Sequence, residues 1–276
     1  MTNRRRRAGL AIPSDLAIYA ASYLAGCVWL FGVATGADTP PGATAAAFLM
    51  GLGLYLLDRV KLQESWLDAA DLYAQPARHA FLRRHSGIVR VSAVTSLVVA
   101  LILIAAMSVR LVALVPLAIL GVLAYARSGS ARIRLKDMTL VKALFVGMGL
   151  ATIAWCAHLP VDPGTRLPAD AWAFLLITLQ GTADGALCDI DDRVADSRFG
   201  TRSLPAVLGI GWTWAIAAAC QAGVLGIALA IDQAGLTTVC AMLALTTPLL
   251  AALPDGQRRD AIDVRLPLIC ALVAIL

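Results

Sequence analysis

Long apolar runs separated by short polar segments follow one another along the whole chain. A helix needs about 20 mostly apolar residues to cross the hydrocarbon core of a bilayer. The pattern therefore predicts nine transmembrane helices, over residues 15–36, 41–60, 88–106, 109–127, 139–158, 169–188, 204–230, 236–253 and 262–276. We expect an all-α polytopic membrane protein with a single domain over residues 1–276, of which 1–14 form a basic cytoplasmic tail.

The composition excludes an ordinary water-soluble protein. Hydrophobic residues make up 59% of the 276 residues and charged residues 15%, whereas soluble proteins average about 45–50% apolar and about 25% charged residues. The mean hydropathy is +0.77. The six cysteines are scattered, mostly within the apolar runs, and form no CxxC pair. We interpret them as small buried hydrophobic residues, with neither a disulfide framework nor a zinc site.

The basic residues fall on one side of the predicted membrane. With the N-terminus inside, all but Arg110 and Arg166 of the 23 Lys and Arg residues lie in the cytoplasmic segments. Cytoplasmic loops are the ones enriched in Lys and Arg. We expect an integral protein of the cytoplasmic (inner) membrane with its functional face in the cytoplasm. Topology explains the net positive charge, so nucleic acid is not an expected partner.

The main acidic stripe follows the sixth predicted helix. Asp189, Asp192 and Asp196 are spaced i, i+3, i+7, which places three carboxylates on one face of a continuing helix. Their mutual repulsion favours a bound cation, and Mg²⁺ is commonly held by a few carboxylates together with phosphate oxygens. The alternative is a solvated acidic helix end. Asp184, deeper in the same run, either lines a polar cavity or is a snorkelling or helix-paired carboxylate.

A second acidic cluster and a basic loop lie on the same predicted face. Asp58 ends the second apolar run, and Asp68 and Asp71 follow as an i, i+3 pair. An interfacial salt bridge between Asp58 and Arg59 is the alternative reading. The basic residues suited to phosphate oxygens, or alternatively only positive-inside loop charges, are Arg132, Arg134, Lys136 and Lys142.

The run from Asp189 to Gly209 resembles the second aspartate motif of the UbiA superfamily of intramembrane prenyltransferases. It reads D-x-x-D-x-x-x-D-x-x-x-G-x-x-S-L-P-x-x-L-G. The nine-helix count and the acidic cluster after the second helix also match. The resemblance implies a ring of nine helices around a central cavity, capped by cytoplasmic loops. Two aspartate motifs there hold Mg²⁺ and the diphosphate of a polyprenyl donor, whose tail lies in an apolar tunnel.

The resemblance also assigns the site residues. The catalytic and metal-binding positions are Asp58, Asp189, Asp192 and Asp196, with Asp68 as a further metal candidate. The diphosphate-binding positions are Arg134, Lys136, Lys142 and Arg202. The chain departs from the family pattern where Cys188 replaces an Asn of the second motif. In the first motif, Leu57 replaces the Asn, and Lys61 and Leu62 leave no carboxylate one turn after Asp58.

The expected activity is Mg²⁺-dependent transfer of a polyprenyl group from its diphosphate to an aromatic or lipid-like acceptor. The expected partners are the polyprenyl diphosphate, a hydrophobic acceptor and the lipid bilayer. Two alternatives stay open. The altered first motif is compatible with a UbiA-type terpene cyclase, in which the prenyl chain's own double bonds capture the cation. It is also compatible with a membrane protein that binds prenyl diphosphate without catalysis.

Overall fold

The structure is a computed structural model that describes residues 14–60, 69–113, 116, 120, 138–159 and 167–275. Within these ranges the regular structure is entirely helical, which confirms the all-α prediction. The elements are α2 (Ile18–Thr35), α3 (Pro41–Val60), α4 (Ala69–Ala74), α5 (Pro76–Arg84), α6 (Ser86–Met107), the 3₁₀ segment η2 (Val109–Ala113), α8 (Val141–His158), α9 (Leu167–Phe199), α10 (Leu204–Val207), α11 (Ile210–Ile231), α12 (Ala234–Thr246), the 3₁₀ segment η4 (Pro248–Ala252) and α13 (Arg258–Ile275).

Seven helices in the described part of the chain are long and apolar enough to cross a membrane. They are α2, α3, α6, α8, α9, α11 and α12 extended by η4. The predicted fourth span, 109–127, lies mostly outside the described residues. The predicted ninth span is present as α13, but charged residues in the first half of this helix make it more polar than the seven apolar helices. The structure therefore confirms a polytopic helical bundle, without establishing the predicted number of nine.

One predicted boundary after the sixth span was wrong. The sixth span was predicted to end at 188 with its helix continuing through the acidic stripe, and α9 does run unbroken to Phe199. The seventh span was predicted from 204, but α10 is a separate short helix and α11 begins only at Ile210. Gly209, with φ at +83°, lies between α10 and α11 in a conformation that favours glycine. Hydropathy alone could not locate this break.

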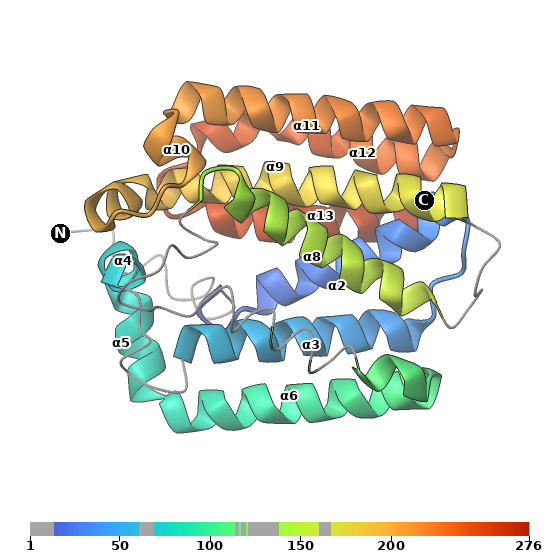
Figure 1. Ribbon diagram of the computed structural model, residues 1–276, viewed down its shortest axis with the longest axis horizontal. Coiled ribbons are helices and arrows are strands. Elements are labelled where there is room, and N and C mark those ends of the chain that lie inside the picture. Colours follow the sequence, from blue (N-terminus) through green and yellow to red (C-terminus); the bar gives the residue numbers. More distant parts are fainter. Residues whose placement is uncertain are drawn as a thin grey trace.

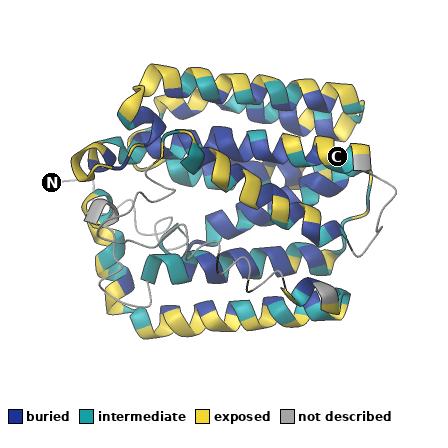
Figure 2. Ribbon diagram, viewed as in Figure 1, coloured by how far each residue is buried: buried dark blue, intermediate teal, exposed yellow. Residues whose placement is uncertain are grey.

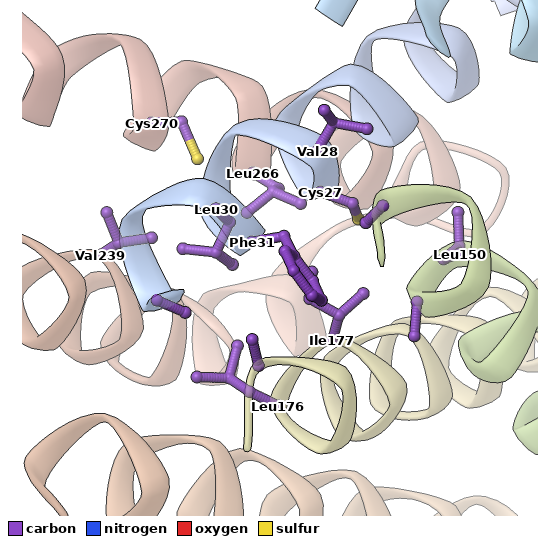
Figure 3. Packing of buried hydrophobic residues seen from close by; sticks show 14 of the residues in the cluster. Cys27, Val28, Leu30, Phe31, Leu150, Leu176, Ile177, Val239, Leu266 and Cys270 are labelled. Carbon is purple, nitrogen blue, oxygen red and sulfur yellow. The ribbon is translucent and has the colours of Figure 1, made fainter. Parts of the chain in front are cut away.

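The centre of the bundle is formed by α2 and α9. Phe31 of α2 packs in an apolar cluster with Leu150 of α8, Ile177 of α9 and Leu266 of α13 (Figure 3). The apolar part of α9 is 72% buried, whereas those of α6 and α11 are 28% buried and lie at the periphery (Figure 2). The outer face of α6 presents large apolar side chains, as expected of a surface that meets lipid. These are Ile88, Val91, Val94, Val98 and Ile102.

One end of the bundle gathers the charged segments. The ends of α3 and α9 and the beginnings of α8 and α13 all lie toward the left in Figure 1, together with α4 and α5; we call this the charged end. The 33 residues of α9 correspond to about 50 Å at 1.5 Å per residue, longer than a hydrocarbon core of about 30 Å. The last turns of α9 therefore extend beyond the length that the apolar core requires.

Close packing of α8 against α9 fixes how the two helices approach the charged end. Gly147 of α8 and Gly181 of α9 face each other: a Cβ on Gly181 would lie 2.8 Å from the Cα of Gly147. A Cβ on Gly147 would clash with the carbonyl oxygen of Thr178 and lie 2.7 Å from Oγ1 of Thr182. The two backbones can approach this closely only without side chains at the contact.

We predict that Gly147→Ala destabilises the protein, because an added methyl group must push α8 away from α9. Overpacking of this kind costs about 1–3 kcal/mol. Gly149→Ala is the matched control on the same helix, since its Cβ would meet no atom within 4 Å. Thermal unfolding in detergent should show a lower Tm for Gly147→Ala and an unchanged or higher Tm for Gly149→Ala. Equal Tm values for the two variants would contradict the packing described.

Candidate functional site

The last turns of α9 hold the acidic stripe that the sequence predicted. Asp189 and Asp196 are each 5% exposed, and Asp192 is half-buried. A buried carboxylate is unfavourable unless a cation or hydrogen-bond donors accompany it. The structure supplies cations from the two helices that flank α9 at this end, α8 and α13.

Lys142, in the first turn of α8, bridges two carboxylates of the stripe. Its Nζ lies 2.6 Å from Oδ1 of Asp189 and 3.9 Å from Oδ2 of Asp196. The structure thus brings together three of the residues that the resemblance had assigned to different roles, two to the metal and one to the diphosphate. The tight contact between α8 and α9 at Gly147 lies five residues further along α8 and supports this arrangement.

Two consecutive arginines at the start of α13 pair with two aspartates of α9. Arg258 forms an ion pair with Asp191, and Arg259 forms one with Asp192. The Asp192 carboxylate raises the pKa of Arg259 well above its ordinary value, so this guanidinium stays charged. Sequence reasoning missed both arginines. The available signal was two adjacent cations directly before an apolar run, but the pairing spans 67 residues and leaves no local pattern.

The two arginines have different surroundings. Arg258 is 6% exposed, and its guanidinium also donates to the carbonyl oxygens of Leu250, at 3.2 Å, and Leu253, at 3.3 Å. Arg258 therefore holds the end of η4 as well as α9. Arg259 is half-buried, and within the described ranges its hydrogen bond goes to Asp192.

Deeper in the bundle, Asp184 is paired rather than open to a cavity. It forms an ion pair with Arg265 of α13 and accepts hydrogen bonds from the Tyr23 hydroxyl, at 2.8 Å, and Gln180 Nε2, at 2.7 Å. Arg265 in turn donates to Oγ1 of Thr247 at 2.8 Å. The sequence left two readings of Asp184 open, and the structure shows the helix-paired one.

The glycine and proline of the motif shape the turn that closes α9. Gly200 adopts φ of +79° directly after the helix, a conformation favoured by glycine. The Thr201 backbone N–H then donates to the Asp196 carbonyl oxygen at 2.9 Å. Pro205 lies in the first turn of α10, where proline is well tolerated. Arg202, a predicted diphosphate ligand, lies in this turn and is exposed.

The short helix α4 packs against the end of α9 through Tyr73. The guanidinium carbon of Arg198 lies 4.8 Å from the centre of the Tyr73 ring, and that ring meets Phe199 edge to face at 5.9 Å. A cation over an aromatic face stabilises such a contact by about 0.5–1 kcal/mol at exposed sites. The segment after α3 is thereby attached close to the acidic stripe.

The first acidic cluster is only partly described. Asp58 is half-buried in the last turn of α3, at the charged end. Its neighbour Arg59 donates to the backbone carbonyl oxygens of Ser14 and of Asp15, the latter at 2.9 Å. The positive charge of Arg259 lies near enough to repel that of Arg59. The predicted ligands Asp68, Arg134 and Lys136 lie outside the described residues, and Asp71 belongs to α4.

The carboxylates of the stripe suit a hard divalent cation. Asp189, Asp192 and Asp196 offer oxygen ligands of the kind that Mg²⁺ prefers, and Oδ2 of Asp196 is buried without a hydrogen-bond partner. Among the described residues, however, no three His, Cys, Asp or Glu side chains converge as a ready-made metal site. The donor chemistry therefore fits Mg²⁺, while Lys142 and Arg259 currently neutralise the oxygens that would bind it.

Comparison with solved structures identifies the same fold. The apo structure of a UbiA homolog from Aeropyrum pernix K1 matches with a TM-score of 0.66 at 16% identity, over 94% of this chain and 98% of that one. A digeranylgeranylglyceryl phosphate synthase matches with a TM-score of 0.54 at 12% identity, over 96% of each chain. At these identities the likeness shows the fold alone. No curated protein matches the sequence.

The family follows from the sequence itself. The model of the UbiA prenyltransferase family matches residues 84–266, which is more than half of the chain. The matched region includes the acidic stripe of α9, Lys142 and the paired arginines of α13. The chain belongs to the UbiA prenyltransferase family.

Proposed function

We propose that this prenyltransferase-family protein moves a polyprenyl group from its diphosphate to a hydrophobic acceptor, in a Mg²⁺-dependent reaction at the charged end. One observation carries the proposal. Three carboxylates at i, i+3, i+7 stand at the end of a central intramembrane helix, with Lys142 within 2.6 Å of one of them. This arrangement combines metal ligands with a phosphate-binding cation beside an apolar interior.

The chain's own residues have distinct roles in this reaction. Asp189, Asp192 and Asp196 would hold Mg²⁺, with Asp58 and Asp68 as further ligands from the first cluster. When bound, Mg²⁺ supplies positive charge that offsets the negative charge growing on the leaving diphosphate. Lys142 donates charge-assisted hydrogen bonds to that diphosphate. The remaining cations in this role are Arg134, Lys136 and Arg202.

The apolar interior of the bundle sets the fate of the prenyl group. Breaking the C–O bond leaves an allylic cation, which water would quench in an open site. An environment from which water is excluded lets an aromatic or lipid-like acceptor capture it instead. The prenyl tail, the bilayer and the acceptor are all apolar, in keeping with the lipid-facing surface of α6.

One observation favours a second candidate function. The first acidic motif retains Asp58, but Leu57 replaces the Asn of the family pattern. Lys61 and Leu62 leave no carboxylate one turn after Asp58. Terpene cyclisation needs the same ionisation but no separate acceptor, because the prenyl chain's own double bonds capture the cation. Mass spectrometry of products from a panel of prenyl diphosphates separates the two, since cyclisation without an acceptor yields a cyclic hydrocarbon by proton loss, or a cyclic alcohol when water captures the cation. Binding without any product would indicate a non-catalytic diphosphate-binding protein.

We predict that the charged end faces the cytoplasm, because Lys and Arg concentrate there. Ser197 at the end of α9 and Ala234 at the start of α12 are both exposed. Single cysteines at these positions, in a variant lacking the native cysteines, should differ toward a membrane-impermeant maleimide. In intact host cells Ala234→Cys should react, and Ser197→Cys should react only after permeabilisation. Labelling of both from the same side would contradict this topology.

We predict that Asp196→Asn abolishes Mg²⁺-dependent binding of prenyl diphosphate and leaves the fold intact. Its Oδ2 accepts no hydrogen bond and lies 3.9 Å from Nζ of Lys142, which keeps its shorter contact with Asp189. The substitution removes a charge that acts jointly with Asp189 and Asp192. Asp170→Asn is the matched control, at the opposite end of the same helix. Titration with farnesyl diphosphate, with Mg²⁺ and with EDTA, measures the effect. Wild-type affinity and metal dependence in Asp196→Asn would refute the site.

We also predict that the first acidic cluster contributes unequally to turnover. Asp58→Ala should reduce activity severely, because this carboxylate stands at the charged end. Asp68→Ala should reduce activity more than Asp71→Ala, if Asp68 replaces the carboxylate missing after Asp58. Product formation by the three variants is compared with that of Asp189→Ala, which should be inactive. Near-wild-type turnover in both Asp58→Ala and Asp68→Ala would exclude this cluster from the site.

A further inference from the structure

We propose that Arg259 is a diphosphate-binding residue that neutralises Asp192 in the substrate-free protein and transfers to the diphosphate when Mg²⁺ takes that carboxylate. This inference rests on the proposed function and adds to it a residue outside both aspartate motifs and outside the basic loop. It also gives the ion pairs of the charged end a defined part in substrate binding.

The first step concerns the charge already present at the stripe. Lys142 approaches Asp189 and Asp196 from α8, while Arg259 approaches Asp192 from α13. The three proposed metal ligands are thus engaged by two protein cations from opposite flanks. A divalent cation entering this site is repelled by both of them and must displace them from the carboxylate oxygens.

The second step concerns where the displaced cations go. A diphosphate that arrives with Mg²⁺ brings several negative oxygens to the place that Lys142 and Arg259 occupy. Charge-assisted hydrogen bonds to phosphate are strong, and a guanidinium fork suits phosphate geometry particularly well. Moving each cation from a carboxylate that Mg²⁺ would hold to the diphosphate keeps these carboxylates and cations paired in both states. Lys142 is already assigned to the diphosphate, and Arg259 occupies the equivalent position on the other flank.

The third step distinguishes Arg259 from its neighbour. Arg258 makes a similar ion pair, with Asp191, but its guanidinium is also fixed by the carbonyl oxygens of Leu250 and Leu253. Arg259 donates one described hydrogen bond, to Asp192, out of the five N–H donors of a guanidinium. Arg258 is therefore a structural anchor, whereas the described hydrogen bond of Arg259 goes to Asp192 alone and the nearby Asp263 carboxylate attracts it only electrostatically.

Binding measurements on R259Q and R258Q test the inference. Mn²⁺, followed by the electron paramagnetic resonance of the free ion, reports metal binding without diphosphate. Farnesyl diphosphate in saturating Mg²⁺ reports substrate binding. We expect R259Q to bind Mn²⁺ tighter and farnesyl diphosphate weaker than the wild type, each by about tenfold, because a hydrogen bond to a charged group is worth at least that much. R258Q should lower the Tm and show no such opposed shifts.

Opposite shifts are the decisive feature, since a purely structural ion pair would weaken both ligands together. R259Q affinities that equal those of the wild type, or that fall together with the Tm as in R258Q, would overturn the inference. R259K keeps a cation beside Asp192 and tests the same point in a variant with a preserved ion pair. We expect it to bind Mn²⁺ as the wild type does and farnesyl diphosphate more weakly, and wild-type diphosphate affinity would contradict the role of the fork.

The same titrations separate this inference from the proposed function. A wild-type protein that binds no farnesyl diphosphate with Mg²⁺ would refute the proposed function, and the inference with it. A wild-type protein that binds it, combined with an R259Q variant that binds equally well, would refute the role of Arg259 alone.

Discussion

Charge neutralisation along α9 is the constraint on which the arrangement of the bundle depends. The helix carries aspartates from its apolar middle to its end, and each needs a cation because an unpaired charge away from water is costly. The cations come from two other helices. Arg265, Arg259 and Arg258 of α13 meet Asp184, Asp192 and Asp191, while Lys142 of α8 meets Asp189. The charges that make α13 unlike the seven apolar helices are thus the ones that fix its place.

Packing and charge work together in this arrangement. Gly147 and Gly181 let α8 approach α9 at backbone contact, so Lys142 lies beside the acidic stripe without a long reach. On the opposite flank, Leu266 lies next to Arg265 in the sequence and packs into the apolar cluster around Phe31. An ion pair in a bilayer protein positions helices effectively only when the surrounding contacts also fit, since a buried pair alone adds little stability.

The sequence predicted the acidic stripe well because its information is local. The spacing of Asp189, Asp192 and Asp196 follows from helix geometry, and the helix indeed continues through them. The partners of these residues could not be predicted in the same way. Arg258 and Arg259 are 67 residues from their aspartates, and hydropathy placed the last span after them. Likewise, the helix end at Phe199 depends on the turn at Gly200, and the number of apolar residues in a segment does not reveal such a turn.

The buried pairing of Asp184 with Arg265 has a consequence for how the sequence can vary. Losing one partner leaves an uncompensated charge at depth, which is strongly destabilising, whereas replacing both by apolar residues of similar volume is often neutral. Tyr23 and Thr247 add further hydrogen bonds to the same pair. The substitutions that each of these four segments of the chain can accept therefore depend on the residues present in the other three. Substitutions at these positions can be tolerated when they occur together, whereas a substitution at one of them alone is destabilising.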